Sequence, residues 1–340
     1  MNPICISQRK LLGAAQWRWW EPVLWVAAFA SPILLPQHAH AIGEIAIVAL
    51  FAISLDLVLG YAGIVSLGHA AFFGLSAYAA ALFAKHVHPD PLLGLVMGVL
   101  PAALLGFVAS FTVHRGTDLT RVMVTLGTSL ILLEAANKLD WLTGGADGLQ
   151  GVAMAPVLGR FEFDLVGRTA AYYALSVLLV CFLVVRRVMH SPFGVSMKAI
   201  RDNRLRATAI GIPVNSRLTA VYTLGAALAG VSGALLAQTS AFASLDVFDF
   251  HRSADVLLIL VIGGAGWLYG GVIGAIVFKS LHGVVSGLTP QYWTFWLGLF
   301  LVVLVLVGRD RLVRPWRWFG PWRKVTRRQQ GIATKVGGEA

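Results

Sequence analysis

SPFGVSMKAIRDNRLRATAIGIP, residues Ser191–Pro213, is a long polar interruption in an otherwise apolar chain. Two arginines precede this segment, Arg217 follows it, and Asp202 is its only acidic residue. Its basic residues are Lys198, Arg201, Arg204 and Arg206. Apolar stretches lie on both sides, so the sequence predicts a basic cytoplasmic loop between two membrane helices.

The composition excludes an ordinary soluble protein. Of 340 residues, 57% are hydrophobic and 13% are charged, and apolar runs long enough to cross a bilayer recur along the chain. A net charge of +11 could indicate nucleic-acid binding, but 21 of the 27 Lys and Arg residues fall in four segments: 1–21, 114–121, 186–217 and 309–340. These are the segments that the positive-inside rule assigns to the cytoplasm, so we expect no nucleic-acid partner.

The apolar runs predict an all-α, polytopic integral membrane protein with about ten spans and both termini in the cytoplasm. The predicted spans are 22–36, 42–59, 60–84, 92–113, 122–139, 169–185, 218–238, 254–269, 270–287 and 293–308. They form a transmembrane domain, residues 22–308, between a cytoplasmic tail, 1–21, and a basic tail, 309–340, that we expect to bind lipid headgroups. Loop 186–217 lies inside the cell in this topology, and loop 140–168 lies outside.

Two of the apolar regions are interrupted by glycines, Gly60–Gly74 in the first half and Gly263–Gly274 in the second. Paired interruptions are typical of an internal repeat whose broken or re-entrant helices line a pathway near the membrane midplane. The alternative is that these glycines only let helices pack closely. The candidate pathway residues are Gly60, Gly63, Ser66, Gly68, His69, Gly263, Gly264 and Gly266.

Ionisable residues inside the spans are further candidates, because a charge in the membrane is costly. For Asp56 we favour a structural hydrogen bond between helices, and His69 is equally compatible with packing and with a pathway. Glu134 and Lys138 are spaced for a local ion pair. Asp255 is expected at the membrane interface. Lys279 and His282 are expected to extend toward the interface.

No catalytic or metal-binding pattern is present. The sequence lacks the G-x-x-x-x-G-K-[ST] motif, so we expect no nucleotide site of this type, no cofactor, no metal and no enzymatic activity in this chain. A transporter without its own energy source must contact one. We therefore interpret Ser191–Pro213 as a docking surface for such a partner. The ionisable groups are scattered, which makes a proton-coupled carrier the weaker reading.

The external segment Trp141–Val152 is rich in turn residues. It is either an ordinary connector or a functional element, namely an outer gate or a landing site for an external partner. Its candidate residues are Thr143, Gly144, Gly145, Asp147 and Gly148.

Three stretches resemble the LivM-type permease subunits of branched-chain amino acid importers, which are ATP-binding cassette importers. They are GYAGIVSLGHAAFFGLSAYAAALFA at Gly60–Ala84, DWLTGGADGLQGV at Asp140–Val152 and SPFGVSMKAIRDNRLRATAIGI at Ser191–Ile212. The resemblance implies a bacterial inner-membrane protein that works with a LivH-type permease, two cytoplasmic ATPase subunits and a periplasmic binding protein. ATP and Mg²⁺ would bind to the ATPases. Leucine, isoleucine and valine are the implied substrates, with urea, amides or aromatic acids as alternatives.

The resemblance also implies that one short helix, roughly Phe193–Gly211, docks on the ATPase. The implied docking residues are Phe193, Gly194, Ile200, Arg201, Arg204, Ala207 and Gly211. Asn203 and Arg206 depart from the acidic residues common in the family, which alters the expected docking charge.

Overall fold

The computed structural model of the chain describes residues 19–116, 118–164 and 166–288, together with a few positions between 292 and 302. The chain divides into two units, Met1–Leu288 and Thr289–Ala340, and the description below concerns the first. The predicted cytoplasmic tail up to residue 18, most of the span 293–308 and the basic tail lie outside the described residues.

Within these ranges the protein is helical, and no strand occurs. Nine helices follow the order of the first nine predicted spans. They are α2 (Trp20–Leu34), α3 (Ala39–Asp56), α4 (Ala70–His86), α5 (Pro91–Arg115), α6 (Asp118–Lys138), α8 (Arg168–Met189), α11 (Val214–Ser240), α12 (Phe250–Gly263) and α13 (Leu268–Leu288). Short elements connect them: α7 (Asp140–Thr143), α9 (Pro192–Asp202), α10 (Arg204–Ala209), the 3₁₀ turns η1 (Pro36–His38), η3 (Gly145–Asp147) and η4 (Leu245–Phe248), and the π-helix η2 (Leu57–Tyr61).

Six of the described helical runs are long and apolar enough to cross a membrane. They cover residues 36–61, 91–113, 119–138, 168–189, 214–240 and 268–287. The helices α2, α4 and α12 are shorter, with 15, 17 and 14 residues. An all-α, multi-pass membrane protein is therefore confirmed, whereas about ten spans and an internal repeat stay predictions.

The helix α5 illustrates how local sequence begins a span. The carboxylate of Asp90 accepts a hydrogen bond from the backbone N–H of Leu92 at 2.8 Å, and Pro91 occupies the first helical position. Proline suits that position because its missing N–H has no partner there in any helix. In the predicted topology the polar turn Lys85–Pro91 lies outside the bilayer. Its residue Asp90 also caps α5.

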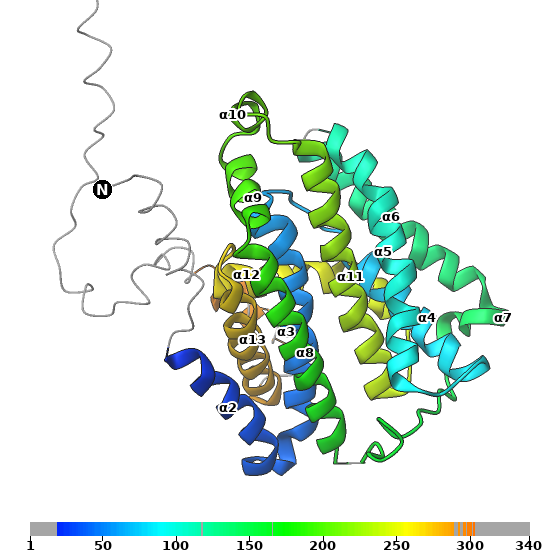
Figure 1. Ribbon diagram of the computed structural model, residues 1–340. Helices are drawn as coiled ribbons and strands as arrows, with labels where there is room; N and C mark the ends of the chain where they lie inside the picture. Colours follow the sequence, from blue (N-terminus) through cyan, green and yellow to red (C-terminus); the bar gives the residue numbers. More distant parts are fainter. Residues whose placement is uncertain are drawn as a thin grey trace, which may run out of the picture. The chain divides into compact units, whose positions relative to one another are not determined.

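The centre of the bundle is formed by α3 and α11, with α4 and α5 packed against α11 (Figure 1). Small residues make these contacts close. A Cβ atom on Gly230 would lie 2.8 Å from the Cβ of Ala102, and one on Gly233 would overlap the carbonyl of Phe73. The hydroxyl of Ser76 donates to the carbonyl of Gly230 at 2.6 Å, which joins α4 to α11. Close packing of small residues is the usual way in which membrane helices associate.

The outer face of α5 and α6 is apolar and exposed. More than half of the surface of each of five large side chains is accessible: Leu100, Leu104, Val108, Leu130 and Ile131. Such a surface suits lipid tails or the membrane helices of a partner subunit.

The connection between α5 and α6 and the segment that carries α9 and α10, which are the two basic loops between predicted spans, lie at one end of the bundle. Figure 1 shows α9 and α10 beyond the ends of α8 and α11, at the end where α5 meets α6. The α4–α5 turn and the beginning of α8 lie at the opposite end. This arrangement agrees with the positive-inside pattern of the sequence.

A buried ion pair joins the first helix to α8 and corrects one expectation. Arg186, counted as part of the basic loop, belongs to α8, which continues to Met189. Its guanidinium donates to the carboxylate of Glu21 on α2, and only 9% and 6% of these two side chains are exposed. The hydroxyl of Tyr269 lies 3.5 Å from the same guanidinium. The loop between α8 and α9 therefore begins later than residue 186.

Candidate functional site

The segment after α8 forms two helices, not the single docking helix implied by the family resemblance. The hydroxyl of Ser191 accepts a hydrogen bond from the N–H of Phe193 at 3.2 Å and begins α9. Asn203 then adopts an extended conformation, with φ −161°, which ends α9. Its side-chain oxygen accepts from the N–H of Arg206 at 3.0 Å and begins α10. Asn203, one of the two residues that depart from the family pattern, is thus a helix cap, a role that asparagine favours.

Several predicted docking residues are structural supports. A Cβ atom on Gly194 would overlap the carbonyl of Met189, so only glycine allows α9 to follow α8 so closely. Ile200 and Ala207 are buried. Gly211 has φ +85° and its N–H donates to the carbonyl of Thr208 at 3.0 Å. This left-handed conformation is the one predicted for a glycine that ends a helix.

The outward side of α10 combines apolar and basic residues. Leu205 is 85% exposed and Ile210 is 68% exposed, and Arg206 lies between them in the sequence and is also exposed. Large apolar side chains on a polar loop are typical of a protein-binding surface. We call Leu205, Arg206 and Ile210 the α10 surface.

The other helix, α9, contacts the membrane bundle. The guanidinium of Arg201 donates to the carbonyl of Gly60, and the ammonium of Lys198 lies 5.6 Å from the centre of the Tyr61 ring. Both partners belong to η2. Charge-assisted hydrogen bonds and cation–π contacts of this kind fix the orientation of a short helix. Arg201 is exposed as well as bound to Gly60, so its predicted contact with an ATPase stays a prediction.

Both predicted glycine interruptions are present in the backbone. The helix α3 widens into the π-helix η2, residues 62–69 are not helical, and α4 begins at Ala70. In the second half, α12 ends at Gly263, and Gly264 and Gly266 have φ values of +94° and +81° before α13 begins. Glycine is needed here because other residues rarely adopt positive φ.

The two interruptions meet. The Asp56 carboxylate accepts a hydrogen bond from the N–H of Gly266 at 2.6 Å, and a Cβ atom on Gly60 would overlap that nitrogen. A Cβ atom on Gly266 would lie 2.9 Å from the guanidinium of Arg201. We call Asp56, Gly60, Arg201 and Gly266 the glycine junction. It links α3, α9 and the turn between α12 and α13, and it supplies the structural hydrogen bond expected for Asp56.

The remaining pathway candidates lie close to the glycine junction or are packed inside the bundle. Gly63 faces the side chain of Arg201, and Gly68 packs on the carbonyl of Thr125 in α6. Ser66 is fully buried. Gly263 packs on the carbonyl of Gly270. These close contacts agree with the packing interpretation, and a role in the pathway stays a prediction.

His69 is also completely buried. Its Nε2 atom lies 3.0 Å from the hydroxyl of Ser54, and its ring stacks on Phe51 with centroids 5.7 Å apart. Phe72 covers the ring edge-on. The contacts of His69 are those that packing predicts.

The external segment is a compact turn structure. Gly144, Gly145 and Gly148 have positive φ, and the Thr143 hydroxyl donates to the carbonyl of Leu139 at 2.9 Å. Leu149 pairs with Ala243 through backbone hydrogen bonds of 2.8 and 3.3 Å. Asp147 is exposed and caps none of the described helices. The segment therefore has a fixed shape, and its role as gate or connector stays open.

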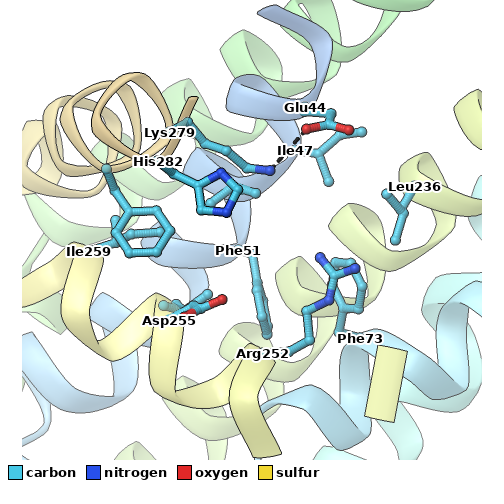
Figure 2. Close-up of a pocket in the computed structure, with 13 residues that line it drawn as sticks. Glu44, Ile47, Phe51, Phe73, Leu236, Arg252, Asp255, Ile259, Lys279 and His282 are labelled. Atoms are coloured by element: carbon cyan, nitrogen blue, oxygen red, sulfur yellow. Dashed lines mark hydrogen bonds and ion pairs between the residues drawn. The ribbon is translucent and has the colours of Figure 1, made fainter. Parts of the chain in front are cut away.

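A cavity of about 150 Å³ lies between α3, α12 and α13, lined also by Phe73 and Leu236. Figure 2 shows its charged residues, which are Glu44, Arg252, Asp255, Lys279 and His282. Lys279 donates to Glu44 at 2.9 Å, and 26% and 40% of these two side chains are exposed, so an interfacial position of the lysine stays a prediction. Asp255 also lines the cavity. The helix α12 begins at Phe250, earlier than the predicted span 254–269, so Asp255 lies within the helix and not at its first turn. By contrast, Glu134 and Lys138 form the predicted local ion pair, at 3.6 Å.

The cavity was not predicted from the sequence. The sequence feature that could have indicated it is the pair Arg252 and Asp255, three positions apart near the start of α12. Glu44 and Lys279 lie in other apolar spans. Residues three apart share a helix face. Which helices that face meets depends on the fold.

Comparisons with known proteins identify relatives over most of the chain. The family model described as "Branched-chain amino acid transport system / permease component" matches residues 39–308. The high-affinity branched-chain amino acid transport system permease protein LivM of Escherichia coli K12 is 27% identical over 316 residues, covering 86% of this chain and 73% of that protein. The fructose import permease protein FrcC of Rhizobium meliloti is 27% identical over 300 residues, covering 85% and 79%.

The autoinducer 2 import system permease protein LsrD of Escherichia coli SMS-3-5 is 26% identical over 273 residues, covering 77% of this chain and 80% of that protein. No solved structure matches the chain. The matches to LivM proteins confirm the resemblance carried by the three sequence motifs. This chain therefore belongs to the family of permease components of branched-chain amino acid transport systems.

Proposed function

We propose that this chain is a membrane-spanning permease subunit of a bacterial inner-membrane ABC importer, with branched-chain amino acids as its substrates. The hydrogen bond from Arg201 to the carbonyl of Gly60 is the observation that carries this proposal. It connects a helix at the end of the bundle directly to the place where two membrane helices are interrupted. A subunit moved by an external ATPase needs a connection of this kind.

The proposed partners are a second, LivH-type permease, two cytoplasmic ATPase subunits and a periplasmic binding protein. The α10 surface is the proposed contact with an ATPase, since it offers apolar side chains next to Arg206. The exposed face of α5 and α6 is available to lipid or to the second permease. ATP and Mg²⁺ bind to the ATPases in this proposal, and both termini of the chain are cytoplasmic.

The mechanism is alternating access. Closure of the ATPase dimer moves α10 and α9, and Arg201 passes the movement to the glycine junction. Because the helices are interrupted there, α12 and α13 can shift relative to α3 without breaking a continuous helical backbone. Hinges of this kind act at a few element-terminal residues.

Substrate identity is supported by the family description and by the LivM relatives, whereas FrcC and LsrD are named for fructose and autoinducer 2. Urea, short amides and aromatic acids are the alternatives within the family. An ion-coupled carrier, the alternative from another class, would transport as a single polypeptide.

Co-purification and uptake together test the proposal. The tagged chain, expressed with its genomic neighbours, should bring down a second permease and an ATPase, and ATP should drive uptake of radiolabelled leucine. Gly211→Val should abolish uptake while the chain still inserts, because a β-branched residue is strained at φ +85°. Uptake by the purified chain alone would contradict an importer subunit. Normal uptake by the Gly211→Val complex would contradict the docking role.

A further inference from the structure

The cavity between α3, α12 and α13 contains charges of both signs within the membrane-spanning bundle. Within the described part of the chain, no side chain forms a hydrogen bond or ion pair with the guanidinium of Arg252 or the carboxylate of Asp255. The one interaction drawn in Figure 2 joins Lys279 to Glu44. Charges inside a membrane protein are costly unless they are paired, and for that reason they commonly mark ligand sites.

The cavity also has apolar walls. Phe51 on α3, Phe73 on α4 and Phe278 on α13 line it together with Val256 and Ile259 on α12. In Figure 2 the guanidinium of Arg252 lies on the side of Phe73, and Asp255 lies on the side of Ile259. A molecule that fits must therefore present a negative group, a positive group and an apolar portion.

We infer that this cavity is a binding site for a zwitterionic α-amino acid with an apolar side chain, a conclusion that rests on the proposed import function. The α-carboxylate pairs with Arg252, whose planar guanidinium suits bidentate binding of a carboxylate. The α-ammonium pairs with Asp255. The side chain lies against the phenylalanines.

Size sets a condition on this assignment. The cavity volume is about 150 Å³, which is the volume of an engineered cavity that accepts benzene. Leucine and valine have more heavy atoms than benzene, so side chains around the cavity must move to admit either of them. A neutral sugar or amide offers neither a carboxylate to Arg252 nor an ammonium to Asp255, so the cavity favours amino acids over the cargoes for which FrcC and LsrD are named.

The cavity is also connected to the glycine junction. The helix α12, which carries Arg252 and Asp255, ends at Gly263, next to the turn that holds Gly266. Near its start, the hydroxyl of Ser253 accepts a hydrogen bond from the N–H of Ala70, the first residue of α4, at 2.9 Å. Movement of α12 relative to α3 therefore opens or narrows the cavity between them.

The test is equilibrium binding of radiolabelled leucine to the importer complex in lipid nanodiscs, without ATP and without the binding protein. Arg252→Met and Asp255→Asn should each weaken binding by about thirtyfold or more, because each leaves one ligand charge unpaired. His251→Gln is the matched control, since its side chain is 85% exposed and next in sequence to Arg252. It should bind leucine like the unaltered complex.

The unaltered complex gives a second measurement that does not depend on whether a variant folds. Unlabelled valine should compete with leucine, whereas 4-methylpentanoate, which lacks the ammonium, and 3-methylbutylamine, which lacks the carboxylate, should compete at least about thirtyfold more weakly. Equal competition by all three, or unchanged binding by folded Arg252→Met, would overturn the site.

Failure of the proposed function has a different signature. A complex that imports fructose but no α-amino acid would refute amino-acid import itself. A complex that imports leucine normally with Arg252→Met and Asp255→Asn would leave import intact and refute only this cavity as the site.

Discussion

The carboxylate of Asp56 accepts a hydrogen bond from the backbone N–H of Gly266 at 2.6 Å, although 210 residues separate the two. Asp56 is the last residue of α3 and is buried, and Gly266 lies in the turn between α12 and α13. Gly266 is partly buried, and a backbone N–H shielded from water needs a partner that the interrupted helix cannot supply. The aspartate therefore satisfies the backbone that the glycine break exposes, and it links the two halves of the chain.

Replacing Asp56 with Ala should destabilise the protein by about 1–3 kcal/mol, because the N–H of Gly266 then loses its buried acceptor. Asp56→Asn is the control, since its amide oxygen can still accept. Thermal unfolding in detergent, monitored by the fluorescence of a cysteine-reactive dye, should give a lower Tm for the alanine variant than for the asparagine variant. Equal Tm values for Ala and the unaltered protein would mean that another group satisfies Gly266.

Replacing Gly60 or Gly127 with alanine should change the stability of the protein in opposite directions. A Cβ atom on Gly60 would overlap Asp56 and Gly266, whereas one on Gly127, inside α6, would meet nothing within 4 Å. Gly60→Ala should therefore cost about 1–3 kcal/mol by overpacking. Gly127→Ala should be neutral or raise stability by up to about 1 kcal/mol, because alanine restricts the unfolded chain more than glycine does. Parallel Tm measurements on the two variants check the sign of each change.

The glycine positions show how far sequence reasoning reaches. Clusters such as Gly263–Gly266 are visible in the sequence, and the structure confirms that the backbone is interrupted there. That Gly60 and Gly266 meet could not be predicted, because it depends on how α3 packs against α13. The same limit applies to Lys279, whose partner Glu44 is 235 residues away. With the lysine near the end of an apolar run, the sequence alone favoured the interface.

The break between α9 and α10 was missed for a local reason. The single helix over Phe193–Gly211 was implied by the family resemblance, and helix-forming residues lie on both sides of Asn203, so nothing but the asparagine marks the break in the sequence. Asparagine within a helix and asparagine as a helix cap look alike in a sequence. Here Asn203 acts as a cap, because its side-chain oxygen accepts a hydrogen bond from the N–H of Arg206.

The buried ion pair between α2 and α8 predicts a strong response to removal of one partner. Glu21→Ala leaves Arg186 charged inside the bundle and should cost about 3–5 kcal/mol. Replacing both partners, as in Glu21→Leu with Arg186→Met, removes the unpaired charge and should recover most of the loss. Tm values of the single and double variants decide between these outcomes. If the double variant were less stable than Glu21→Ala, the pair would not be the source of the loss.

Arg201 and Arg206 lie in the same loop, but their replacement should impair different steps: coupling for Arg201 and ATPase binding for Arg206. Arg201 is exposed but donates a hydrogen bond to Gly60 of the bundle, so Arg201→Gln should leave the ATPase bound and ATP hydrolysis measurable while leucine uptake falls by about tenfold or more, as expected for loss of one charge-assisted hydrogen bond. Arg206 is part of the exposed α10 surface, and Arg206→Gln should weaken co-purification of the ATPase without changing the Tm of the permease. Arg201→Lys keeps the charge but not the planar fork, and its uptake should lie between those of Arg201→Gln and the unaltered complex. Reconstituted complexes assayed for uptake and hydrolysis in the same vesicles separate coupling from docking. Loss of ATPase binding by Arg201→Gln would show that Arg201 acts at the partner interface, as the sequence alone suggested.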